Sequence, residues 1–167
     1  MNANLNIRNW LGASSEHDIV LDWLVGINDK YLCANTECGY QNERKFNPCP
    51  ECGSQDSISV TQKLQQPSKQ LFKQKQDAYK FAISMGIHMN SNEKSITLDK
   101  NQTKKIWNTS VIDPDGSIKE LCTSIFADYQ GDPYVLVETL ASIGLDQIKQ
   151  FVDQQTFSFT EILSQIK

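Results

Sequence analysis

The residues with the clearest chemistry in this 167-residue chain are four cysteines that form two close pairs, Cys33 with Cys38 and Cys49 with Cys52. Two such pairs can supply four thiolates to one tetrahedral metal ion, at sulfur–metal distances of about 2.3 Å. Each pair is followed by a glycine, Gly39 or Gly53, which lets the backbone turn and donate an amide to a thiolate. Four thiolates leave no open coordination position, so the pattern predicts structural rather than catalytic metal binding.

The second pair lies in the specific motif Cys49-Pro50-Glu51-Cys52-Gly53, in which Pro50 stiffens the turn. With this motif, residues 30–60 resemble a zinc ribbon. The first pair departs from the commonest pattern because four residues, rather than two, separate its cysteines. The resemblance implies one structural Zn²⁺ held by Cys33, Cys38, Cys49 and Cys52, flanked by Tyr31, Tyr40 and Phe46. A rubredoxin-type iron site and a redox dithiol switch are the alternatives.

Composition and cysteine count predict the class of protein and its cellular compartment. Hydrophobic residues make up 39% and charged residues 22%, which is typical of a globular protein with a packed core. The fifth cysteine, Cys122, makes the count odd, and the N-terminus lacks a basic start followed by an apolar run. Both features disfavour a secreted disulfide framework and predict a cytoplasmic protein. The longest apolar runs, such as residues 134–137, are too short for a membrane helix.

Charge is distributed unevenly although the net charge is only −4. Residues 30–110 carry twelve Lys and Arg against seven Asp and Glu, whereas residues 1–29 and 111–167 are both acidic. This pattern is either ordinary surface scatter or a face for a polyanion or an acidic partner. On the second interpretation, the predicted nucleic-acid or partner contacts are Arg44, Lys45, Lys69, Lys73 and Lys75.

The predicted fold is mainly α, with a small β-type four-cysteine zinc ribbon joined to an α-helical domain. Four segments follow one another along the chain. They are an N-terminal helical element (1–29), the ribbon (30–60), a connector rich in Gln and Lys (61–76) and the α-helical domain (77–167). Ser15 is expected to cap the first helix, whose apolar face carries Ile19, Val20, Trp23 and Leu24.

Local signals place the first elements after the connector. Apolar residues at helical spacing, from Ala78 to Met85, predict a helix that ends at Gly86. Alternation over residues 95–98 favours a short strand, and residues 104–107 suit one helical turn. The sequence Asp113-Pro114-Asp115-Gly116 is a strong turn signal.

Further signals mark the helices that follow this turn. Ser117 and Glu120 match a capping box at the start of the next helix. Asp132 and Pro133 suit the cap and first position of another, which Gly144 should end before a further helix carrying Ile148, Phe151 and Val152. A last helix is predicted from a second capping box, residues 158–161.

Motifs for catalysis are missing from the sequence. It has no phosphate-binding Gly-rich loop, no Gly-x-Ser-x-Gly and no His-Glu-x-x-His. His17 and His88 are expected at the surface, and Cys122 in an apolar helical stripe is expected to be an inert buried thiol. Four acids, Asp113, Asp115, Asp128 and Asp132, resemble a divalent-metal set, but a turn and a cap account for three of them. We therefore expect no enzyme activity.

Two further motifs lie in Phe81–Ile87, a helix that ends in Gly and an apolar residue, and in Glu138–Leu145, which has Glu, Ala and Gly in that order. With them, residues 72–152 resemble a small accessory family of the bacterial Dnd DNA-phosphorothioation systems, which act in phage defence. Thr139 and Leu140 depart from that family's more polar helix. The resemblance implies a place in a DNA-defence complex and assigns no catalytic residue.

These observations together predict a non-catalytic accessory or adaptor subunit of a bacterial DNA-handling complex, one that contacts a partner protein and DNA. The first alternative is a protein-interaction module without nucleic acid. The second, a zinc-dependent transcription regulator, is disfavoured because no helix-turn-helix with a basic recognition helix is visible. A homo-oligomer stays open, since the apolar stripes of the C-terminal helices suit a core or a dimer interface equally.

Overall fold

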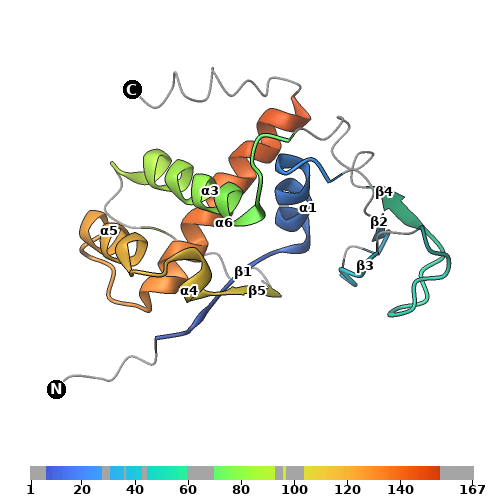
Figure 1. Cartoon of the computed structure of the whole chain (residues 1–167), viewed down its shortest axis with the longest axis horizontal. Helices are drawn as coiled ribbons and strands as arrows, with labels where there is room; N and C mark the ends of the chain where they lie inside the picture. Colours follow the sequence, from blue (N-terminus) through green and yellow to red (C-terminus); the bar gives the residue numbers. More distant parts are fainter. Residues whose placement is uncertain are drawn as a thin grey trace. The chain divides into compact units, whose positions relative to one another are not determined.

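The computed structural model describes residues 7–27, 31–35, 37–42, 45–59, 70–92, 96 and 104–154. These residues form helices α1 (Ser15–Leu24), α3 (Lys75–Asn90), α4 (Thr109–Ile112), α5 (Ser117–Ile125) and α6 (Pro133–Asp153), and strands β1 (Trp10–Ala13), β2 (Tyr31–Cys33), β3 (Gln41–Asn42), β4 (Ser57–Ser59) and β5 (Lys104–Asn108) (Figure 1). The mainly α fold with a small β-type four-cysteine segment is confirmed.

The chain divides into two compact units. Unit 1 comprises Met1–Ser14 with Tyr79–Gln147, and unit 2 comprises Ser15–Ala78 with Ile148–Lys167. The predicted four-segment division stays a prediction. Residues 61–69 of the predicted connector, most of the predicted strand 95–98 and the predicted last helix lie outside the described residues.

The sheet of unit 1 is the antiparallel pair β1 and β5, with Trp10 opposite Asn108 and Ala13 opposite Lys104. The expected helical turn at residues 104–107 is therefore wrong. These residues form β5 because β1, from the far N-terminal part of the chain, supplies the strand with which their backbone pairs. The ring of Trp107 packs 4.9 Å from the ring of Tyr79 on α3.

Helices α3 and α6 approach each other closely in unit 1 at two glycines. A Cβ added to Gly86 would lie 2.7 Å from the carbonyl carbon of Leu140, and one added to Gly144 would lie 2.7 Å from that of Ala82. Both distances are shorter than real Cβ contacts. The two glycines therefore let the backbones meet, an approach that favours Cα–H···O contacts between helices.

The expected helix ends at these glycines are therefore wrong. Helix α3 continues through Gly86 to Asn90, and α6 continues through Gly144 to Asp153. The expected separate helix with Ile148 is thus part of α6. Around the crossing, both helices contribute fully buried side chains to the core, among them Ala82, Leu136, Val137, Leu140, Ala141 and Leu145.

Side-chain carboxylates begin two helices of unit 1. Asp132 accepts a hydrogen bond from the backbone N–H of Tyr134 at 2.9 Å, which confirms the predicted cap of α6. The predicted capping box of α5 is wrong, because Ser117 is the first helical residue and makes no side-chain cap. The turn instead directs Asp113 to the helix, where its carboxylate accepts from the N–H groups of Ile118 and Lys119 at 2.9 and 3.0 Å.

A largely buried ion pair anchors the N-terminal segment in unit 1. One guanidinium nitrogen of Arg8 lies 3.1 Å from the carboxylate of Glu138 on α6. The same carboxylate oxygen accepts from the backbone N–H of Gly12 at 2.7 Å. Arg8 also donates its backbone N–H to Asp132 at 2.8 Å and stacks over the ring of Trp10. Removing either charge would leave the other without its partner in a poorly hydrated place.

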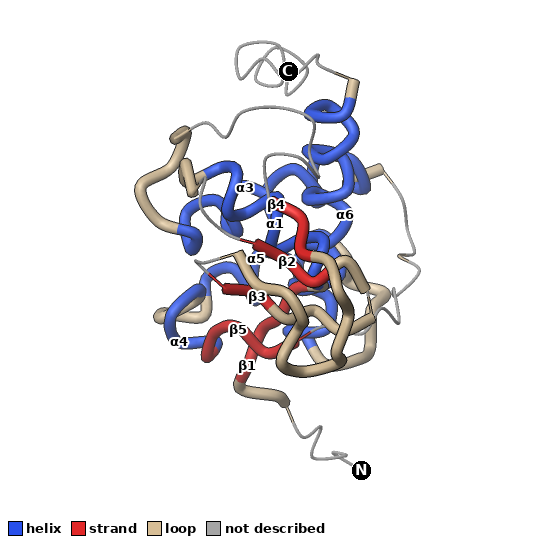
Figure 2. The backbone as a smooth tube through the Cα atoms, turned by 90° about the vertical axis from the view of Figure 1, so that its right-hand side faces the viewer, coloured by secondary structure: helices blue, strands red, loops and turns tan. Residues whose placement is uncertain are grey.

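In unit 2, α1 is buried along most of its length, including Ile19, Val20, Trp23 and Leu24 as predicted. Unit 2 also contains a three-stranded sheet with the strand order β3-β2-β4, in which both strand pairs are antiparallel (Figure 2). None of the helices in the described part of the chain has the length and apolarity needed to cross a membrane.

The close approach of α3 and α6 at Gly86 and Gly144 predicts an unusual effect of a Gly-to-Ala substitution on stability. Ala in place of Gly inside a helix normally stabilises by about 1 kcal/mol. Gly86→Ala is expected to destabilise unit 1 instead, by about 1–3 kcal/mol, because the methyl group would meet backbone rather than a movable side chain. Chemical denaturation measures this difference. Ser84→Ala, at an exposed position of the same helix, is the control; equal stability of the two variants would contradict the crossing.

The ion pair gives a second prediction. Arg8→Ala is expected to destabilise the protein by about 2–3 kcal/mol, since Glu138 keeps its charge and loses its partner. The double variant Arg8→Ala/Glu138→Gln should recover part of that loss, because a neutral amide oxygen still accepts from Gly12. Thermal unfolding of the wild type, Arg8→Ala, Glu138→Gln and the double variant tests the coupling. If the two substitutions change the stability by strictly additive amounts, Arg8 and Glu138 are not coupled.

Candidate metal centre

The four predicted ligand cysteines come together in unit 2. Their sulfur atoms all lie within 4.8 Å of one another. Cys33 lies 3.4 Å from Cys52, and Cys38 lies 3.7 Å from Cys49. Thiolates at about 2.3 Å from one tetrahedral ion would be about 3.8 Å apart. The cluster therefore has the size of a four-thiolate metal site.

Backbone structure explains how residues so far apart in sequence converge. Cys33 ends β2, the central strand of the sheet, and its N–H donates to the carbonyl of Tyr40 at 2.9 Å. The second pair is closed by two hydrogen bonds, from the N–H of Cys49 to Ser54 and from the N–H of Gly53 to Cys49, both 2.8 Å. Gly53 has a φ of +72°, which a residue with a Cβ rarely adopts.

Backbone amides donate to three of the four sulfurs. The donor lies two residues after the cysteine in each case: Asn35 for Cys33, Tyr40 for Cys38 and Ser54 for Cys52. The first pair also has its glycine, Gly39, at a φ of +64°. This is the arrangement expected from a glycine after each pair. The side chain of Ser54, which belongs to no motif of the sequence analysis, forms a further hydrogen bond with Cys33.

The electrostatics of the cluster differ from one sulfur to the next. The amide of Ser54 lowers the pKa of the Cys52 thiol to about 7. The amide of Tyr40 favours the Cys38 thiolate, but burial and the three neighbouring thiols raise its pKa to about 12. Two like charges 4 Å apart repel by about 4 kcal/mol at an effective dielectric constant of 20. Four thiolates therefore need a shared cation, which would displace their protons.

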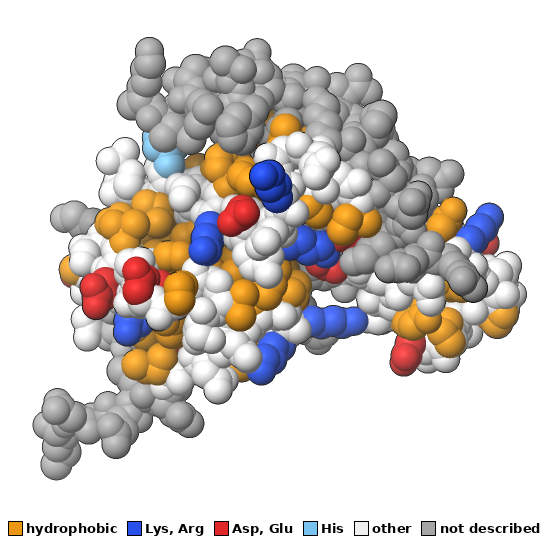
Figure 3. Space-filling view, in the orientation of Figure 1, with side chains coloured by type: hydrophobic (Ala, Val, Ile, Leu, Met, Phe, Trp, Pro, Cys, Tyr) orange, Lys and Arg blue, Asp and Glu red, His pale blue; other side chains and the backbone are white. Residues whose placement is uncertain are grey.

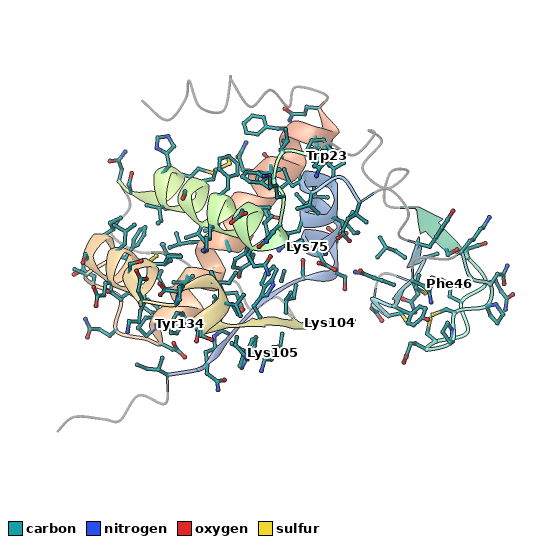
Figure 4. All side chains as sticks on the ribbon, in the orientation of Figure 1. Trp23, Phe46, Lys75, Lys104, Lys105 and Tyr134 are labelled. Carbon is teal, nitrogen blue, oxygen red and sulfur yellow. The ribbon has the colours of Figure 1, made fainter. Side chains whose placement is uncertain are left out.

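Two of the three aromatic residues expected to flank the site, Tyr40 and Phe46, contact each other, whereas the third, Tyr31, lies on β2. Tyr40 and Phe46 pack edge to face, with ring centroids 5.1 Å apart, and Phe46 is labelled among the residues of this segment in Figure 4. The tyrosine hydroxyl accepts a hydrogen bond from Asn42 at 3.0 Å. Cys33 and Cys49 are buried, whereas Cys52 is exposed. Cys38 is intermediate between them, so the exposure of the four cysteines differs from one to the next.

Three of the five predicted contact residues lie in the described part of the chain, and their contact with nucleic acid or a partner stays a prediction. Lys45 and Lys73 are exposed, while Arg44 and Lys69 lie outside the described residues. Lys75, at the start of α3, instead forms ion pairs with Asp18 and Asp22 of α1 (Figure 4). Those carboxylates raise the pKa of its ammonium group against the effect of burial. Its charge is therefore matched by two carboxylates inside unit 2.

Two lysines that the sequence analysis did not name are exposed in unit 1. They are Lys104 and Lys105 on β5, both labelled in Figure 4. Figure 3 draws the Lys and Arg side chains of this view in blue. The sequence signal for Lys104 and Lys105 was their place in the basic stretch 30–110, but the expected helical turn would have directed their side chains differently.

Other candidate residues take structural roles. Burial raises the pKa of the Cys122 thiol to about 12, as expected for an inert core cysteine. His17 is only 3% exposed, so its expected surface position is wrong, whereas His88 is exposed. The four acids do not converge, since the cysteines are the only metal-binding cluster among the described residues.

Comparisons with protein-family models, curated proteins and solved structures find no match to this chain. The resemblance of residues 72–152 to the Dnd accessory family gains no support from them. The metal site therefore rests on its own geometry.

The cluster predicts one metal ion per chain. Cys49→Ser should abolish stoichiometric metal binding, because it removes a buried ligand and leaves three thiolates. Elemental analysis of the purified protein measures the metal, and protease resistance of residues 31–59 reports the local fold. Cys122→Ser removes a cysteine outside the cluster and should change neither. Unchanged metal content in Cys49→Ser would refute the assignment.

Proposed function

We propose that this chain binds one structural Zn²⁺ through Cys33, Cys38, Cys49 and Cys52, and serves as a non-catalytic accessory or adaptor subunit. The observation that carries the proposal is the convergence of four unbridged cysteine sulfurs within 4.8 Å. Zn²⁺ suits a tetrahedral thiolate set and has no redox chemistry of its own. Rubredoxin-type iron is less suited, because only ten residues separate Cys38 from Cys49.

A structural role follows from the ligand count. All four tetrahedral positions are filled by protein sulfur, so no site is left for a substrate or an activated water. Within the described residues, no second group of His, Cys, Asp or Glu could hold a catalytic ion. The segment would then act through the surface that the ion holds in place.

That surface combines aromatic and charged groups. Tyr40 and Phe46 are half-buried, and Lys45 beside them is exposed, with Arg44 next to it in sequence. Aromatic rings with adjacent cations suit stacking on bases and contacts with phosphates. Glu37 and Glu51 are exposed on the same segment, which weakens attraction to a polyanion. We therefore propose a protein of a DNA-handling complex as the main partner, with DNA as a second contact.

A pull-down of the tagged chain from its host, with and without nuclease, tests this role. A nuclease-resistant partner that modifies or cleaves DNA would support the adaptor. Nucleic acid recovered without a stable protein partner would contradict the adaptor and favour the segment as a direct binder. A nuclease-resistant partner unrelated to DNA would favour the alternative, a protein-interaction module.

Direct DNA contact gives a further prediction. Affinity should fall steeply with salt concentration, and the slope should be smaller in Arg44→Ala/Lys45→Ala because fewer counterions are released, about one per lost phosphate contact. Fluorescence anisotropy with a labelled duplex and a labelled single strand measures the slope. Lys119→Ala, in unit 1, is the control and should leave it unchanged. Absence of binding at low salt would remove DNA from the proposal.

A further inference from the structure

The close sulfur contacts in the cluster join one cysteine pair to the other. Cys33 lies 3.4 Å from Cys52, and Cys38 lies 3.7 Å from Cys49. A disulfide formed along either contact would link the two turns of the site. The bond itself is about 2.05 Å long, so the first contact needs the smaller sulfur movement.

Access to solvent distinguishes the two contacts. Cys52 is exposed and Cys38 is partly exposed, while Cys33 is 6% and Cys49 only 2% exposed. A small oxidant therefore reaches Cys52 first, and the sulfur of Cys33 lies 3.4 Å from it. An exposed thiolate beside a second cysteine is the usual setting of reversible cysteine oxidation.

We propose that Cys52 is a site of oxidation by hydroperoxides, that Cys33 resolves it as a disulfide, and that this reaction releases the metal. The inference rests on the proposed zinc site, whose ligands it uses. All four cysteines have the same role as metal ligands, but they have different roles in this reaction. Cys52 is oxidised by the hydroperoxide, Cys33 forms the disulfide with it, and Cys38 and Cys49 remain thiols.

The reaction balances with the hydroperoxide as the only oxidant. The Cys52 thiolate attacks one peroxide oxygen, the O–O bond breaks and a sulfenic acid forms. The remaining oxygen leaves as hydroxide from hydrogen peroxide, or as alkoxide from an alkyl hydroperoxide, and takes a proton to become water or an alcohol. The Cys33 thiolate then attacks the Cys52 sulfur, forming the S–S bond and breaking the S–O bond. The hydroxide takes a second proton and leaves as water. Two thiolates lose two electrons together, and the peroxide gains them.

The metal is lost because two of its four ligands no longer carry charge. Cys38 and Cys49 alone offer two thiolates, too few for a closed tetrahedral site. The new disulfide would meanwhile keep β2 joined to the second cysteine pair. Oxidation would thus remove the ion without separating the two halves of the site, and a thiol reductant with fresh zinc should reverse it.

The test uses the full-length zinc-loaded protein and hydrogen peroxide. A chromogenic chelator follows zinc release, and alkylation before and after reduction, read by mass spectrometry, maps the bonded cysteines. We expect loss of the one zinc ion to accompany formation of one Cys33–Cys52 disulfide, with Cys38 and Cys49 still open to alkylation. Cys122→Ser should behave as the wild type does.

A second variant examines the resolving step. In Cys33→Ser the partner at 3.4 Å is gone, so Cys52 should proceed to sulfinic acid under the same treatment. The proposal fails if Cys38–Cys49 forms first, if a disulfide closes within either pair, or if zinc stays bound after Cys52 is oxidised. A protein isolated without zinc would refute the metal site instead, and the alkylation map of that metal-free chain would still decide the pairing.

Discussion

Among the described residues from 31 to 59, the buried apolar side chains are those of Leu32, Cys33 and Cys49, and two of these three are cysteines of the cluster. Fixing each residue's backbone costs about 1–2 kcal/mol, and one buried leucine returns only about 2–3 kcal/mol. The burial of apolar side chains therefore cannot by itself stabilise the fold of this segment. Bonds from the four sulfurs to a shared ion would supply what its core lacks, because metal binding couples to folding.

The metal site was predictable because its signal is local. Two cysteine pairs, each followed by a glycine, specify ligands and turns with no information about the rest of the chain. Asp132 before Pro133 was predictable for the same reason, since a cap and its helix are neighbours in sequence. What the sequence could not show is that Ser54 reaches Cys33, or that Lys75 is matched by two carboxylates of α1, because these depend on distant segments.

The errors in the helical region have a common physical origin. Glycine lowers helix propensity, so Gly86 and Gly144 resemble helix ends, yet the missing side chain also permits close packing. Only the neighbouring helix decides between the two roles. The strand at residues 104–107 is similar, because its partner β1 lies at the other end of the sequence. Ser117 lost its capping role to Asp113, which was assigned to the turn alone.

The amides that donate to the sulfurs belong to the backbone, and this has an evolutionary consequence. Side chains at positions 35, 40 and 54 can be exchanged without removing a backbone donor, and only proline, which lacks the N–H group, would do so. The one side-chain bond that such an exchange would remove is that of Ser54 with Cys33. The interior of the site can therefore be inherited unchanged while its outer residues diverge. Related chains could share this centre while presenting quite different surfaces to different partners.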